Sequence, residues 1–148
     1  MDIKQVFIRF AIFFARKIYI PGEKLAQKVY HSLPSEQWTT VHGMPWLINI
    51  HQSIGCHLFI SGKYASARIA EIQAVVKTGD TVIDIGANVG YFTLLFAKLV
   101  GKEGKVYSFE PEPTNYRLLL KNIELNGYNN VIAIQKAVSN VNGKVKLF

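Results

Sequence analysis

The segment that most constrains this chain is the run Val82-Ile-Asp-Ile-Gly-Ala-Asn-Val-Gly-Tyr-Phe-Thr93, which is followed by Val106-Tyr-Ser-Phe-Glu110. The pattern predicts a strand, a glycine turn that opens a helix, and a second strand that ends in an acid. Two strands joined through a helix in this way lie parallel in one sheet. The sequence therefore predicts an α/β fold, namely the first half of a Rossmann-like, mostly parallel sheet with helices on both faces.

The acid in the first strand indicates which cofactor the turn would hold. Asp84 stands two residues before Gly86. A dinucleotide would bring a pyrophosphate to this point, whereas S-adenosylmethionine (SAM) would bring an ammonium and a sulfonium. A carboxylate attracts the cation and repels the phosphate. The glycines, Gly86-Ala-Asn-Val-Gly90, also depart from the G-x-G-x-x-G pattern of dinucleotide sites. SAM is therefore the expected cofactor.

The polar and glycine residues around the turn have separate expected roles. Gly86 allows a sharp turn and a close approach to the ligand, and Gly90 keeps the new helix close to the sheet. Asn88 tolerates unusual backbone angles and can form hydrogen bonds. Glu110, about 20 residues after the turn, can accept hydrogen bonds from both ribose hydroxyls. The alternative is an ordinary strand-turn-helix corner whose glycines serve packing alone.

The other elements follow from hydrophobic spacing and turn residues. The expected order is helix 2–19, a loop with weak helix to 43, strand 46–50, helix 66–77, strand 81–86, helix 89–100, strand 105–109, helix 113–126 and strand 131–136. Asn142-Gly143 predicts a turn before a further strand over 144–148. Either Thr114 or Asn115 is expected to cap the helix that begins at 113.

At these residues the chain resembles the FkbM family of SAM-dependent methyltransferases. The resemblance covers about residues 60–148 and rests on the ordered words Lys77-Thr-Gly-Asp80, Val82 to Thr93, Phe109-Glu-Pro-Glu-Pro113, Asn122-Ile-Glu-Leu-Asn126 and Ala137-Val-Ser-Asn140. It implies a class I methyltransferase fold and methyl transfer from SAM to a hydroxyl of a sugar, lipid or secondary metabolite. The cofactor-binding residues expected on this basis are Asp84, Gly86, Ala87, Asn88, Gly90, Phe92, Glu110, Pro111 and Ala137.

Length bears on how much of such an enzyme is present. A class I domain needs about seven strands, and this chain supplies the first three and one more at most. The expected division is an N-terminal helical extension over 1–60 and the N-terminal half of a SAM-dependent methyltransferase domain over 61–148. A truncated form of a longer enzyme is therefore expected. The loops that build the acceptor site would follow later strands, so the catalytic base stays unassigned.

Two further features concern partners and location. Residues 2–19 combine a broad apolar face with a narrow basic one, which fits either packing on the protein, the favoured reading, or peripheral contact with a membrane. The net charge of +7 could steer an acidic substrate or anionic lipid. The lysines are spread along the chain without interleaved aromatics, which argues against nucleic acid and favours a small-molecule, glycan or lipid acceptor. The oligomeric state is left open.

The cysteine and histidine residues indicate a cellular compartment and predict no metal site. His42, His51, Cys56 and His57 fit no closed zinc pattern, and one cysteine suits a reducing compartment such as the cytoplasm, with membrane association as an addition. Two alternatives to an active methyltransferase are retained. The first is a truncated, non-catalytic SAM-binding or interaction module, and the second is a NAD-type oxidoreductase, against which Asp84 argues.

Overall fold

The computed structural model describes residues 31–62 and 64–144. Contacts between residues divide the chain into two compact units, Met1–Tyr64 and Ala65–Phe148. The helix predicted over 2–19 and its membrane contact lie outside the described residues, as does most of the strand predicted over 144–148. Within the described ranges, no helix is both long enough and apolar enough to cross a bilayer.

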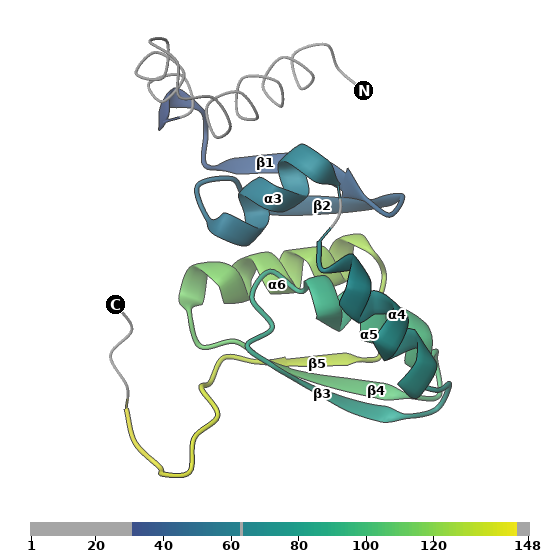
Figure 1. The fold of residues 1–148 in the computed structure, drawn as a ribbon. Coiled ribbons are helices and arrows are strands. Elements are labelled where there is room, and N and C mark those ends of the chain that lie inside the picture. The colour runs from purple at the N-terminus through teal and green to yellow at the C-terminus, as the bar shows by residue number, and fades with distance from the viewer. Residues whose placement is uncertain (1–30, 63, 145–148) are drawn as a thin grey trace. The chain divides into compact units, whose positions relative to one another are not determined.

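A β-hairpin forms the first part of the described chain (Figure 1). Strands β1 (Glu36–Val41) and β2 (Met44–Asn49) pair antiparallel. The two residues between them, His42 and Gly43, both have positive φ angles, 51° and 80°, which suits a two-residue hairpin turn. The expectation of loop and weak helix up to residue 43 is therefore wrong for β1. The short turn lets the residues before it pair with β2, which corresponds to the strand predicted over 46–50.

Helix α3 (Ser53–Ser61) packs on this hairpin and was not predicted. Its buried residues include Leu58 and Phe59, and the β2 strand that it contacts has the buried residues Trp46 and Ile48. Gly55 lowers the helix propensity of the segment. A Cβ at Gly55 would collide with the backbone carbonyl of Asn49, so close packing on the hairpin requires the residue that weakens the helical signal.

The second unit contains the predicted α/β arrangement (Figure 1). Its elements are α4 (Ser66–Val75), β3 (Thr81–Ile85), α5 (Tyr91–Val100), β4 (Lys105–Phe109), α6 (Pro113–Leu125) and β5 (Val131–Ile134). The strands pair in parallel in the order β3-β4-β5. This result confirms the fold class, and each of these elements begins and ends within two residues of its predicted position.

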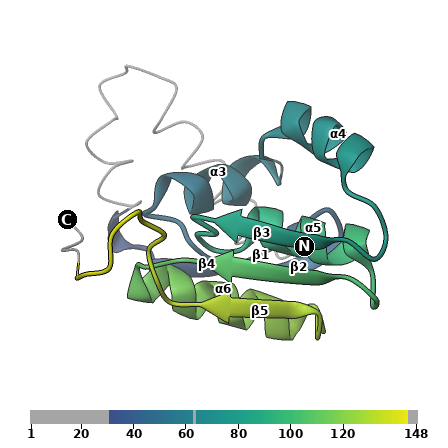
Figure 2. The same cartoon turned by 90° about the horizontal axis from the view of Figure 1, so that it is seen from below.

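Helices α5 and α6 cover the same face of this sheet (Figures 1 and 2). Ala97 and Val100 of α5 pack on Val106 of β4 at the centre of a buried cluster. The opposite face presents Ile83 and Ile85, which are 61% and 63% exposed. Apolar side chains on both faces are typical of a strand inside a parallel sheet with two covering layers, and a helix on the second face stays a prediction.

Candidate functional site

The site begins where β3 and β4 end, at the carboxyl edge of the parallel sheet. The backbone N–H groups of Gly86 and Ala87 both donate to the carbonyl oxygen of Phe109, at 2.9 and 3.0 Å. The turn after β3 is therefore tied to the last residue of β4. In α/β sheets the carboxyl edge is where ligands bind.

Left-handed backbone conformations shape this glycine loop, which we define as residues 86–90. Gly86, Asn88 and Gly90 have φ angles of 80°, 51° and 96°. The left-handed angle at Asn88 agrees with the tolerance expected of this residue, and its side-chain Oδ1 accepts from the N–H of Val89 at 2.9 Å. A loop with this many left-handed residues has a defined shape, because few residue types adopt such angles without strain.

The two glycines of the loop differ in their surroundings. A Cβ on Gly86 would meet no atom within 4 Å, so there is open space beside this backbone. A Cβ on Gly90 would lie 2.8 Å from Cδ1 of Leu119 and 3.3 Å from Cδ1 of Leu94. Gly90 therefore allows α6 to pack closely against the start of α5, whereas the space at Gly86 is available to a ligand.

Glu110 joins the glycine loop to the segment after β4. Its side chain is 5% exposed. Oε2 accepts from the N–H of Asn88 at 2.7 Å, and Oε1 accepts from the N–H of Glu112 at 2.9 Å. An ionised carboxylate has about four acceptor positions, so each oxygen can accept one more hydrogen bond. The expected role in holding ribose stays a prediction, and the loop contacts were not anticipated.

Asp84 is buried beneath the start of α5, with 8% of its side chain exposed. The hydroxyl of Thr93 donates to its Oδ2 at 2.6 Å, and the hydroxyl of Ser108 donates to Thr93 Oγ1 at 3.0 Å. Burial raises the pKa of Asp84, the Glu110 carboxylate raises it further, and hydrogen bonds from Thr93 oppose both, so that the pKa is raised overall.

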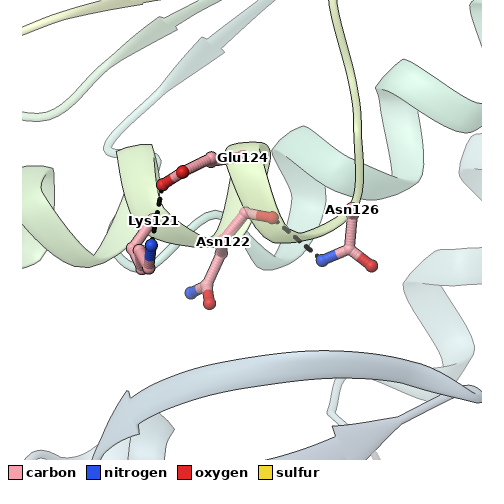
Figure 3. Close-up of polar contacts among 4 residues, drawn as sticks. All are labelled: Lys121, Asn122, Glu124 and Asn126. Carbon is pink, nitrogen blue, oxygen red and sulfur yellow. Dashed lines mark hydrogen bonds and ion pairs between the residues drawn. The ribbon is translucent and has the colours of Figure 1, made fainter.

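Asn122 holds the glycine loop from the side of α6. This fully buried side chain donates through Nδ2 to the carbonyl oxygen of Val89 at 2.9 Å. Near the end of the same helix, Asn126 donates to the Asn122 carbonyl and Lys121 pairs with Glu124, both drawn in Figure 3. Sequence reasoning assigned Asn122 no role, although a polar residue on the buried face of an amphipathic helix was the available signal.

Glu112, and neither Thr114 nor Asn115, caps α6. Its carboxylate accepts from the N–H of Thr114 at 3.0 Å and of Asn115 at 2.6 Å. Burial acts to raise the pKa of Glu112, but these hydrogen bonds outweigh it and the pKa is lowered. The capping prediction fails because the two residues supply the N–H donors of the cap while the preceding acid supplies the acceptor.

The remaining predicted site residues have less direct links to the loop. Phe92 is half-buried and its ring lies against those of Tyr91 and Phe96, with centroids 5.4 and 6.4 Å apart. Pro111 is half-buried between Glu110 and the cap of α6. Ala137 is exposed in the segment after β5. The cofactor roles of Phe92, Pro111 and Ala137 stay predictions.

A cavity lies apart from this edge of the sheet. A cavity of about 740 Å³ is lined by residues at the amino end of β4 and the ends of α5 and α6, including Lys98, Lys102 and Lys105. It is at the opposite end of the strands from the glycine loop.

No group of three or more His, Cys, Asp or Glu residues in the described ranges could hold a metal ion.

Comparison with known proteins identifies relatives of this arrangement. A family model described as the TRM5/TYW2 methyltransferase domain matches residues 49–147. TYW2 of Methanocaldococcus jannaschii, solved in complex with AdoMet (SAM), is 29% identical with a TM-score of 0.53, over 70% of this chain and 44% of that chain. Trm5 of the same organism, solved with adenosine, shares the fold with a TM-score of 0.56 at 24% identity, over 76% and 33% of the two chains.

A curated relative adds a second kind of methyltransferase. The protein-L-isoaspartate O-methyltransferase of Ignicoccus hospitalis is 35% identical over 81 residues, which are 55% of this chain and 38% of the relative. The chain therefore spans less than half the length of each of these three relatives. The comparisons support a SAM-dependent methyltransferase of class I fold and do not point to FkbM specifically.

The expectation about partners is wrong. Trm5 and TYW2 relatives act on tRNA, which contradicts both the argument against nucleic acid and the small-molecule, glycan or lipid acceptor. That argument judged lysines by their spread along the sequence. Lys98, Lys102 and Lys105 lie close together in the sequence and line one cavity, so the argument from an even spread overlooked this local gathering of positive charge.

Proposed function

Because the chain belongs to the TRM5/TYW2 methyltransferase domain family, we propose that it carries the SAM-binding site of an enzyme that transfers a methyl group from SAM to RNA. SAM supplies an electrophilic methyl group on a sulfonium. The residues of this chain would bind and orient that cofactor, while the acceptor and its base belong to parts of the site that we do not assign.

Two buried carboxylates beside the glycine loop carry the cofactor proposal. Asp84 and Glu110 are 8% and 5% exposed. In the part of the chain that the structure describes, hydroxyl and backbone N–H groups contact them and no basic side chain forms an ion pair with either. Buried charge without an opposite partner is costly. A cationic ligand would lower that cost, and the open space beside Gly86 gives it room.

The charge of Asp84 argues against the NAD-type alternative. A pyrophosphate placed at the start of α5 would approach Asp84, and like charges at short range in a poorly solvated site repel strongly. SAM is electrostatically the better match. The proposal therefore treats Asp84 as a contact for the ammonium or sulfonium end, and Glu110 as the acceptor for ribose hydroxyls at its remaining lone pairs.

RNA is proposed as the acceptor on two grounds. The family members Trm5 and TYW2 act on tRNA, and the net charge of +7 suits a polyanion. A non-catalytic module would also bind SAM. Only methyl transfer to an acceptor therefore distinguishes an RNA methyltransferase from such a module. The FkbM resemblance remains a prediction from the motifs of the cofactor half.

The first test is a thermal melt of the 148-residue chain with SAM and with NAD⁺. SAM is expected to raise the melting temperature and NAD⁺ to leave it unchanged, because only the cation complements the two acids. A shift with NAD⁺ alone would overturn the cofactor assignment. The second test uses the longest natural form of the protein, radiolabelled SAM and an unmodified tRNA transcript, and label in the RNA is the expected result. SAM binding without transfer would favour the non-catalytic module.

A further inference from the structure

We propose that Thr93 and Ser108 are positioning residues that keep the Asp84 carboxylate charged and fixed for the cationic end of SAM. The inference rests on the proposed cofactor. It concerns three side chains from three elements, β3, α5 and β4, of which only Asp84 was recognised in the sequence.

Sheet register brings the three side chains together. Asp84 and Ser108 are paired positions of the adjacent parallel strands β3 and β4, so both side chains point to the face that α5 covers. Thr93, in the first turn of α5, lies between them. Thr93 and Ser108 are fully buried. Water is therefore excluded from both hydroxyls, and their hydrogen-bond partners are set by the fold.

The hydrogen bonds run in one direction, from Ser108 through Thr93 to Asp84. Ser108 Oγ donates to Thr93 Oγ1 at 3.0 Å, and Thr93 Oγ1 donates to Asp84 Oδ2 at 2.6 Å. A threonine hydroxyl has one proton. Because Thr93 accepts from Ser108, that proton is directed at the carboxylate, where it stabilises the ionised form and fixes the position of Oδ2.

The surroundings of Asp84 otherwise favour its neutral form. Burial disfavours the carboxylate, and the charged group that faces it within the described residues, Glu110 at the end of β4, has the same sign. From α5 the facing group is the uncharged Thr93. Its hydroxyl and backbone N–H oppose these effects. Without the hydroxyl, Asp84 would hold its proton to higher pH and attract a cation less.

The test compares Thr93→Val, Thr93→Ser and Ser108→Ala with the exposed control Thr81→Val on β3. Two quantities are measured for each protein. The first is the Asp84 titration midpoint, followed without SAM through the carboxyl ¹³C resonance. The second is SAM affinity by calorimetry from about pH 5 to about pH 8.

The three site variants have graded expected results. Thr93→Val should raise the Asp84 titration midpoint and the midpoint of the pH profile of SAM affinity by about one pH unit each. SAM binding on the acid side should then be about tenfold weaker. Ser108→Ala should shift them less and in the same direction. Thr93→Ser should restore the wild-type profile and Thr81→Val should leave it unchanged. Should Thr93→Val fail to fold, Ser108→Ala and Thr93→Ser still give the comparison.

The outcomes separate this inference from the proposed function. A wild-type chain that binds no SAM would remove the proposed cofactor, whatever the titration of Asp84 shows. Normal SAM binding with unchanged pH profiles in folded Thr93→Val and Ser108→Ala would overturn the positioning role alone. A loss of stability without any change in the pH profile would show that the hydroxyls only fasten α5 to the sheet.

Discussion

Asp84 places a cost on the fold that a cofactor can offset. Burial and the Glu110 carboxylate raise its pKa above the ordinary aspartate value despite the hydrogen bonds from Thr93. The folded chain therefore binds this proton more tightly than the unfolded chain does. The corresponding stability is fully present below the ordinary aspartate pKa and is lost as the pH rises through the raised folded value. Ionisation of Asp84 in the folded chain therefore comes at the expense of stability.

Asp84→Asn should therefore stabilise the protein and impair the site. The amide keeps an acceptor for Thr93 and removes the buried charge, so the melting temperature without SAM at neutral pH should rise and its decline with increasing pH should flatten. SAM binding should weaken by about 2 kcal/mol, since a charge-assisted contact is lost. Melts at several pH values with and without SAM measure both effects. An unchanged shift by SAM would remove Asp84 from the site.

Glu110→Ala tests whether this acid serves the cofactor, the loop or both. Its removal leaves the N–H groups of Asn88 and Glu112 without their acceptor, which should cost about 1–3 kcal/mol of stability before any ligand is added. SAM affinity should fall by a similar amount if the carboxylate also binds ribose. Denaturant unfolding and calorimetry separate the two numbers. A destabilised variant with normal SAM affinity would leave Glu110 as a structural residue.

Which residues the sequence revealed depends on how far their contacts reach along the chain. Asp84, Gly86 and Asn88 were recognisable because strand, turn and helix follow one another within a short motif. Thr93 and Ser108 were not, since their function as a pair depends on the register between β3 and β4 and on the face that α5 covers. Buried hydroxyls within apolar segments were the only local signal.

At the scale of elements, α6 depends on its N-terminal cap. Glu112→Ala removes the acceptor for the N–H groups of Thr114 and Asn115 and should cost about 1 kcal/mol. Because the pKa of Glu112 is lowered in the fold, its contribution is present above the ordinary glutamate pKa and is lost as the pH falls through the folded value. Urea unfolding at neutral and acid pH checks this. The exposed Glu103→Ala is the matched control, and equal effects in both variants would contradict the capping role.

Helix α6 also supports the glycine loop through one side chain. Asn122→Ala leaves the buried carbonyl of Val89 without its donor and should cost about 1–3 kcal/mol. The N–H of Gly90, which donates to the Ala87 carbonyl, should then exchange with deuterium faster. Hydrogen exchange with and without SAM measures the loosening, with the exposed Asn129→Ala as control. Unchanged protection at Gly90 would show that the loop keeps its shape without α6.

The elements of the second unit were predictable because the hydrophobic spacing and the glycines at the helix ends agree with the tertiary fold. Elements of the first unit were not. Strand β1 depends on pairing through the His42-Gly43 turn, and α3 contains Gly55, which the contact with Asn49 requires. In both cases a contact between segments decides the structure, and intrinsic propensity is too weak to reveal it.

For the second unit as a whole, the uncovered face of the sheet is open to a direct test. Ile83 and Ile85 are largely exposed there, and apolar patches of this kind promote association. Ile83→Lys should reduce light scattering of the 148-residue chain with little change in melting temperature. The control Leu120→Lys, at a 44% exposed position on α6, should have a smaller effect. A marked loss of stability in Ile83→Lys would mean that this face is covered in solution.

The glycine loop is held from two directions, at Asn88 by Glu110, which follows β4, and at Val89 by Asn122 of α6. Its shape is therefore established during folding and does not wait for a ligand. A receptor prepared in this way loses little conformational freedom on binding. Cofactor capture should then be a single kinetic step whose observed rate rises linearly with SAM concentration, without the plateau that a slow rearrangement of the loop would impose.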